Sequence, residues 1–93
     1  MEGIGNCVGY ASEIEDNIYN LLNSNLDYIA GMETYTTEAI DAVATYMLGV
    51  SQKRSDIQWN IIERPDASFE RGSASICWIE NGHLNHIVLD VKY

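Results

Sequence analysis

The sequence predicts a small α+β domain in which two N-terminal helices pack on a three-stranded antiparallel β-meander. Two patterns lead to this fold class. Apolar residues recur every three or four positions in the first half, as in amphipathic helices, and alternate with polar residues in the second half, as in half-buried strands. The 93 residues suit one domain, with a helical half at 1–52 and a β-meander at 53–93.

The first helix is expected to carry one apolar stripe. Ser12 and Glu15 match a capping box at its start, although Asn6 offers an earlier cap. The polar run 23–25 is a plausible end. The stripe consists of Ala11, Ile14, Ile18, Leu21 and Leu22.

The sequence is compatible with two structures for residues 26–36. Gly31 and Met32 can turn a short hairpin, or residues 26–30 can form a helical turn.

A second helix is predicted to begin at Thr36 or Thr37 and to end at Gly49 or in the polar run 51–54. It is apolar on two sides, so we expect it to be either well buried or partly reserved for a partner. One side consists of Ile40, Val43, Ala44, Met47 and Leu48, and the other of Ala39, Ala42 and Tyr46.

Three strands are expected to follow. Residues 57–61 and 74–78 alternate, Pro65 interrupts the pattern, and Asn81-Gly82 is the strongest short signal for a hairpin. A two-residue loop there pairs Glu80 with His83, and the rest of the register follows. The predicted core face carries Ala74, Ile76, Trp78, Ile87, Leu89 and Val91. The opposite face carries Ser75, Cys77, Ile79, Leu84, His86 and Val88.

That opposite face is more apolar than a solvated face should be. It is therefore either a contact site or a surface that a loop or residues 26–36 cover.

The net charge of −9 is unevenly distributed. Residues 1–52 contain eight carboxylates and no Lys or Arg, which gives −8, whereas residues 53–93 contain six acids and five bases, which gives −1. Such a chain repels nucleic acid and anionic membrane, so neither is an expected direct partner. A basic protein is the expected partner, unless the acidity serves only solubility.

Carboxylates on a rigid scaffold can imitate phosphates and occupy a basic groove. In type, the chain resembles small acidic inhibitors such as phage-encoded, anti-CRISPR-like antagonists of bacterial defence nucleases and the immunity proteins of nuclease toxins. A non-enzymatic inhibitor is therefore the leading hypothesis. Its expected partner is a nuclease or another protein that handles nucleic acid. The expected binding residues are Glu13, Glu15, Asp16, Asp27, Glu33, Glu38 and Asp41.

A cysteine hydrolase is the second hypothesis. Cys7 follows a glycine-rich entry, and His86 lies in an apolar strand, an arrangement similar to papain-like and transglutaminase-like hydrolases. The resemblance implies Cys7 as nucleophile and His86, or else His83, as base. Three features depart from the family pattern. The chain is short, and no further strand is expected to bring the usual orienting residue. Asp90 is too far along the strand to orient His86, and Asn85 points to the opposite face. The alternative is that Cys7 is a small buried hydrophobe.

No metal or cofactor is expected. Cys7, Cys77, His83 and His86 could supply four ligands, but the paired spacings of zinc sites are missing, as is a glycine-rich phosphate loop. With no signal peptide or membrane span apparent, we expect a cytoplasmic protein of a bacterial or infected host cell. A third hypothesis is a homodimeric module that uses the apolar hairpin face or the open sheet edge.

Overall fold

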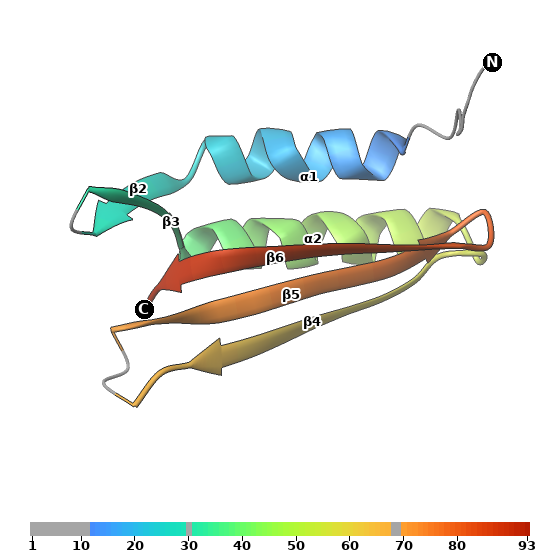
Figure 1. Ribbon diagram of the computed structural model, residues 1–93. Coiled ribbons are helices and arrows are strands. Elements are labelled where there is room, and N and C mark those ends of the chain that lie inside the picture. The colour runs from blue at the N-terminus through green and yellow to red at the C-terminus, as the bar shows by residue number, and fades with distance from the viewer. Residues whose placement is uncertain (1–11, 30, 68–69) are drawn as a thin grey trace, which may run out of the picture.

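The computed structural model describes residues 12–29, 31–67 and 70–93, and places two helices on one face of a five-stranded mixed sheet (Figure 1). The strand order is β2-β3-β6-β5-β4. The elements are α1 (Glu13–Asn23), β2 (Leu26–Ile29), β3 (Met32–Thr36), α2 (Thr37–Lys53), β4 (Gln58–Pro65), β5 (Arg71–Glu80) and β6 (His83–Lys92).

The predicted fold class, two helices on a three-stranded antiparallel meander, is wrong. The antiparallel strands β4, β5 and β6 form only part of the sheet. A hairpin, β2–β3, lies between the two helices in sequence and extends the sheet, because β3 pairs with β6 in parallel. That pairing joins Tyr35 to Val91 and Thr36 to Lys92.

The hairpin resolves the ambiguity over residues 26–36. Leu26 pairs with Tyr35 and Ile29 with Met32 across an antiparallel ladder. Gly31 lies in the turn with a φ of +78°, in the left-handed region that favours glycine. The helical-turn alternative for residues 26–30 is therefore wrong.

Both helices begin at side-chain caps. The Ser12 hydroxyl accepts a 2.9 Å hydrogen bond from the Glu15 amide, and the Thr36 hydroxyl accepts a 3.3 Å bond from the Ala39 amide. The Ser12 cap and the end of α1 at Asn23 agree with the sequence prediction. The alternative cap, Asn6, lies outside the described residues.

The β5–β6 hairpin has the predicted register. Asn81 and Gly82 have φ values of 52° and 78°, so both adopt the positive φ that a type I′ turn requires. Glu80 therefore lies opposite His83, and Cys77 lies opposite His86.

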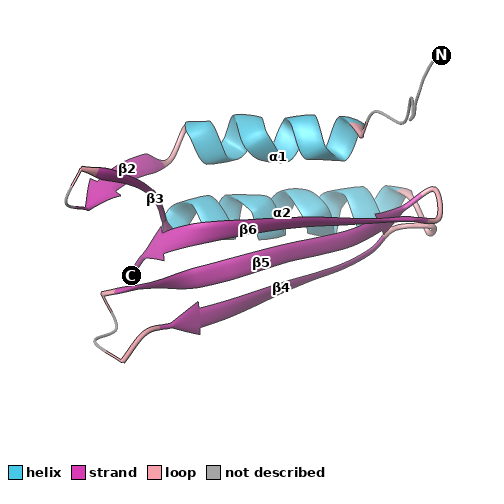
Figure 2. Cartoon of the chain, in the orientation of Figure 1, coloured by secondary structure: helices cyan, strands magenta, loops and turns pink. Residues whose placement is uncertain are grey.

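The core lies between the helices and the sheet (Figure 2). Trp78 is its largest fully buried side chain, whereas Leu48 of the predicted α2 stripe is 52% exposed. Neither described helix has the length and apolarity that a membrane span needs. The core consists of Ile14, Ile18, Leu22, Ala39, Ile40, Val43, Met47, Ile57, Ala74, Ile76, Trp78, Ile87, Leu89 and Val91.

Candidate functional site: an acidic groove between the helices

The predicted binding carboxylates lie in two groups. The helices α1 and α2 run antiparallel, so their acidic first turns point to opposite ends of the molecule (Figure 1). An 11-residue helix is about 16 Å long, so the groups are too far apart to bind one side chain. One group is Glu13, Glu15 and Asp16 of α1, and the other is Asp27 of β2, Glu33 of β3, and Glu38 and Asp41 of α2.

The α1 group has a local explanation. Acidic side chains in a first turn interact favourably with the helix dipole. In addition, Glu13 lines a hollow together with Lys53 and Arg54 from the end of α2. These cations partly offset its negative charge, so this group is the weaker candidate for partner binding.

The α2 group borders a groove. Glu38 and Asp41 line a hollow between the two helices, with a floor that includes Leu21 and Tyr46. A second hollow shares Leu21 and Tyr46 and continues along α1. We call the combined feature the helix groove, which is lined by Asn17, Asn20, Leu21, Ser24, Glu38, Asp41, Ala42, Thr45 and Tyr46.

Tyr46 lines both hollows of the helix groove. Its half-buried hydroxyl accepts a 2.9 Å hydrogen bond from the Asn17 side-chain amide, which joins α2 to α1. The ring provides an apolar and aromatic surface beside the exposed carboxylates of Glu38 and Asp41. An aromatic face next to carboxylates is suited to a guanidinium or ammonium group. None of the side chains that line the groove is basic, whereas the adjoining hollow at the start of α1, which shares Tyr46, is lined by Lys53 and Arg54.

The two hairpin carboxylates do not line the helix groove. Asp27 Oδ2 forms a 3.1 Å ion pair with Lys92 Nζ. Glu33 is exposed on β3 and, after burial, is the second cause of a raised pKa at Tyr35. Of the seven predicted residues, the structure therefore brings only Glu38 and Asp41 together at a groove.

Glu80 has a buried carboxylate whose interactions the sequence did not predict. Its Oε1 accepts hydrogen bonds from Ser12 Oγ at 2.7 Å and Trp78 Nε1 at 3.2 Å, while Arg54 Nη1 lies 3.8 Å from its Oε2. The group joins α1, α2 and the β5–β6 hairpin, which is a structural role. Strand alternation could have revealed it, because Glu80 follows Ala74, Ile76 and Trp78 on the core face.

The structure does not test the geometry that the hydrolase hypothesis requires. Cys7, the expected nucleophile, lies outside the described residues, and so does any distance from Cys7 to His86. His86 is exposed on β6 opposite Cys77, while Asn85 belongs to the other face. Within ranges 12–29, 31–67 and 70–93, no three His, Cys, Asp or Glu side chains are grouped to hold a metal ion.

The helix groove is thus a candidate site for a cationic side chain of another protein. No protein-family model, curated protein or solved structure matches this chain.

Proposed function

We propose that this protein is a non-enzymatic inhibitor of the immunity or counter-defence type. It binds a basic protein, such as a nuclease, through the helix groove. The observation that carries the proposal is the position of Glu38 and Asp41, two exposed carboxylates beside Tyr46 in a groove lined by no basic side chain.

The groove suits an arginine of the partner. Glu38 and Asp41 are three residues apart on α2, so they lie on the same side of the helix. A guanidinium can bind these carboxylates while it stacks on Tyr46 and its aliphatic stem contacts Leu21. Burial of such charge-assisted hydrogen bonds at the centre of an interface makes arginine a common anchor residue.

The surrounding charge supports the same partner class. Residues 1–52 carry −8 of the net −9, and the first cation in the sequence is Lys53. This field accelerates association with a basic surface and weakens as salt screens it. The carboxylates would occupy phosphate positions in the partner's nucleic-acid groove, which blocks that groove without any chemical step.

The test has two stages. Immobilised protein captures partners from a bacterial lysate at low salt, and double-stranded DNA and RNA then compete for each captured protein. We expect a basic protein that nucleic acid displaces and whose Kd rises at least tenfold between about 50 and 200 mM salt, because salt screens the attraction between its cations and these carboxylates.

Two charge-reversal variants test whether the helix groove is the surface that binds the partner. Asp41→Lys should raise the Kd of the partner at least tenfold. Asp90→Lys changes the net charge equally, but it lies on β6 outside the helix groove and should raise the Kd less than threefold. Equal effects of both variants would contradict the groove as the binding site. Simultaneous binding of nucleic acid and this protein to the partner would contradict inhibition by phosphate mimicry.

A further inference from the structure

Each helix contributes one regular stripe of side chains to the helix groove. On α1 the lining positions are 17, 20, 21 and 24, and on α2 they are 38, 41, 42, 45 and 46. Both sets follow the three- and four-residue spacing of a single helix face. At 1.5 Å per residue, each stripe is about 10–12 Å long. The groove is therefore a track about two helical turns in length.

The floor of the helix groove is apolar and its rims are polar. Leu21, Ala42 and Tyr46 are half-buried and form the floor. The two hollows have volumes of about 560 and 520 Å³, so a single arginine side chain fills only part of the groove. An occupant that covers the whole floor needs an apolar side as well as a charge. The α2 rim carries Glu38, Asp41 and Thr45, and the α1 rim carries Asn17, Asn20 and Ser24.

A helix suits this track better than an extended segment. The backbone N–H and C=O groups inside α1 and α2 bond to one another, so the floor offers none of them to an occupant. An extended segment over Leu21 and Tyr46 would bury main-chain polar groups without partners, which costs free energy. A helix satisfies its own main chain and presents side chains at the same three- and four-residue spacing as the two stripes.

Charge varies along the helix groove. Glu38 and Asp41 lie toward the start of α2, whereas Tyr46 also lines the adjoining hollow that contains Lys53 and Arg54. From Asp41 to Lys53 the axis of α2 covers about 18 Å, at 1.5 Å per residue. Cations of an occupant are therefore attracted to the Glu38 end of the groove and repelled from the Tyr46 end.

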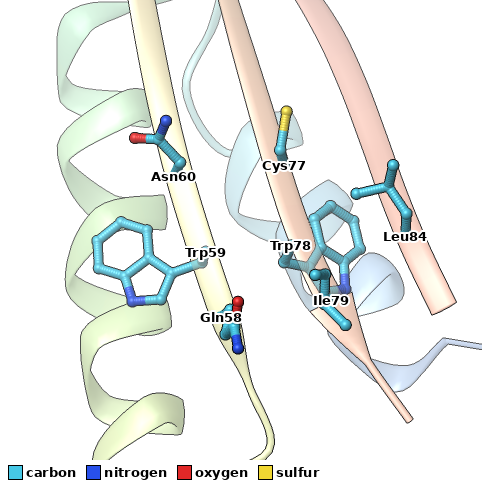
Figure 3. Close-up of a pocket in the computed structure, with 7 residues that line it drawn as sticks. All are labelled: Gln58, Trp59, Asn60, Cys77, Trp78, Ile79 and Leu84. Carbon is cyan, nitrogen blue, oxygen red and sulfur yellow. The ribbon is translucent and has the colours of Figure 1, made fainter. Parts of the chain in front are cut away.

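Another hollow lies at the hairpin end of the sheet, between β4, β5 and β6 (Figure 3). Its volume is about 220 Å³, and none of the described residues that line it is charged. The strands β2 and β3 lie beside β6 in the sheet, so they do not cover this hollow. Nothing there selects one class of occupant, whereas the helix groove combines an apolar floor with a charged rim.

We propose that an amphipathic helix of the basic partner occupies the helix groove. Its apolar side packs on Leu21, Ala42 and Tyr46 over about two turns. Its arginines lie in the half that reaches Glu38 and Asp41, and the other half carries no cation. This inference rests on the proposed function, which names the groove and a basic partner but not the part of the partner that enters the groove.

Such a helix fits inhibition by competition. Many DNA-binding proteins place a helix against the duplex, and arginines of such elements contact phosphates. While the helix lies in the groove, Glu38 and Asp41 occupy these arginines, so the same helix cannot contact nucleic acid.

A synthetic peptide tests the helical occupant. The probe has about 18 residues, because shorter isolated helices are marginal in water. It carries leucine and alanine on one helix face and two arginines beside that face in one half. One control peptide permutes the order so that no apolar face forms, and another has a central proline that breaks the helix. Fluorescence anisotropy at about 50 mM salt measures binding to the full chain. We expect the Kd of the probe to be at least tenfold lower than that of either control.

Two alanine positions of α2 test the contact. Ala42→Gln places a longer neutral side chain on the floor and should raise the Kd of the probe at least tenfold. Ala44→Gln is the matched control, because Ala44 is also half-buried on α2 but does not line the helix groove, and it should change the Kd less than twofold. Thermal denaturation checks that both variants are folded. Asp41→Lys, which removes the charge instead of the apolar contact, should also raise the Kd at least tenfold.

The outcomes separate this inference from the proposed function. Equal binding of the probe and its controls, or equal effects of Ala42→Gln and Ala44→Gln, would overturn the helical occupant. The proposed function would stand in that case if a captured basic partner still depends on Asp41. A lysate that yields no basic protein displaced by nucleic acid would overturn the proposed function, even if the probe binds.

Discussion

The Ser12 hydroxyl donates a 2.7 Å hydrogen bond to Glu80 Oε1, although 68 residues separate them in the sequence. The same hydroxyl accepts from the Glu15 amide and so caps α1. One side chain therefore fixes the start of the first described helix to the end of β5, and both Ser12 and Glu80 are buried.

Replacement of Ser12 by alanine should lower the free energy of unfolding by about 2–4 kcal/mol. Loss of a cap costs about 1 kcal/mol, and loss of a donor to the buried Glu80 costs about 1–3 kcal/mol more. Urea unfolding measures the change. Ser24→Ala is the control at the other end of α1, because the exposed Ser24 hydroxyl donates only to the Asn20 carbonyl. A similar loss in both variants would contradict the special role of Ser12.

Substitutions of Glu80 should separate its hydrogen bonds from its charge. Glu80→Gln keeps an acceptor for Ser12 and Trp78 but loses the ionic contact with Arg54, so we expect a loss of about 1 kcal/mol. Glu80→Ala leaves both donors without their acceptor and should cost about 3 kcal/mol or more. Unfolding followed by tryptophan fluorescence measures both variants. A loss in the alanine variant no larger than in the glutamine variant would refute this account.

Two glycines should respond to alanine in opposite directions. A Cβ at Gly49 of α2 meets no atom within 4 Å, so Gly49→Ala should raise the free energy of unfolding by about 0.5–1 kcal/mol. A Cβ at Gly72 would overlap the Arg64 carbonyl oxygen and approach Pro65 Cα to 2.6 Å, so Gly72→Ala should be strongly destabilising. Thermal denaturation of both variants checks the signs. A Gly72→Ala variant as stable as the wild type would refute the close approach of β4 and β5.

Alkaline pH should destabilise the fold through Tyr35. Burial, followed by the nearby charges of Glu33 and Tyr19, raises the pKa of Tyr35 above 10.0. Because the folded state holds this proton more tightly, the contribution to stability is complete below pH 10 and is lost as pH rises through the folded pKa. The urea midpoint at pH 8 and pH 11 should therefore fall further in the wild type than in Tyr35→Phe. An equal fall in both would contradict the prediction.

Local signals in the sequence predicted individual elements well. Asn81-Gly82 fixes a two-residue loop, and such a loop leaves only one register for β5 and β6. The Ser12 cap was also readable, because capping depends on residues three positions apart. The same holds for the sheet face that points away from the helices, since alternation along a strand assigns its side chains to one side.

Long-range pairing explains what the sequence analysis missed. The strands β2 and β3 are only four and five residues long, and no local pattern indicates that β3 pairs with β6. The acidic residues were predicted as one binding set because charge can be counted along a chain. Their separation into two groups, and the role of Tyr46 in the helix groove, depend on how α1 packs against α2.

Because β3 pairs in parallel with β6, the acidic half of the chain depends on the C-terminal strands. The groove-forming helices belong to residues 1–53, yet they pack on Ile76, Trp78 and Ile87, and β3 is held by Val91 and Lys92. An excised acidic half would therefore lose its hydrophobic support and the shape of the helix groove. During synthesis, β6 follows every other described element, so the groove can reach its final shape only after β6 has been made.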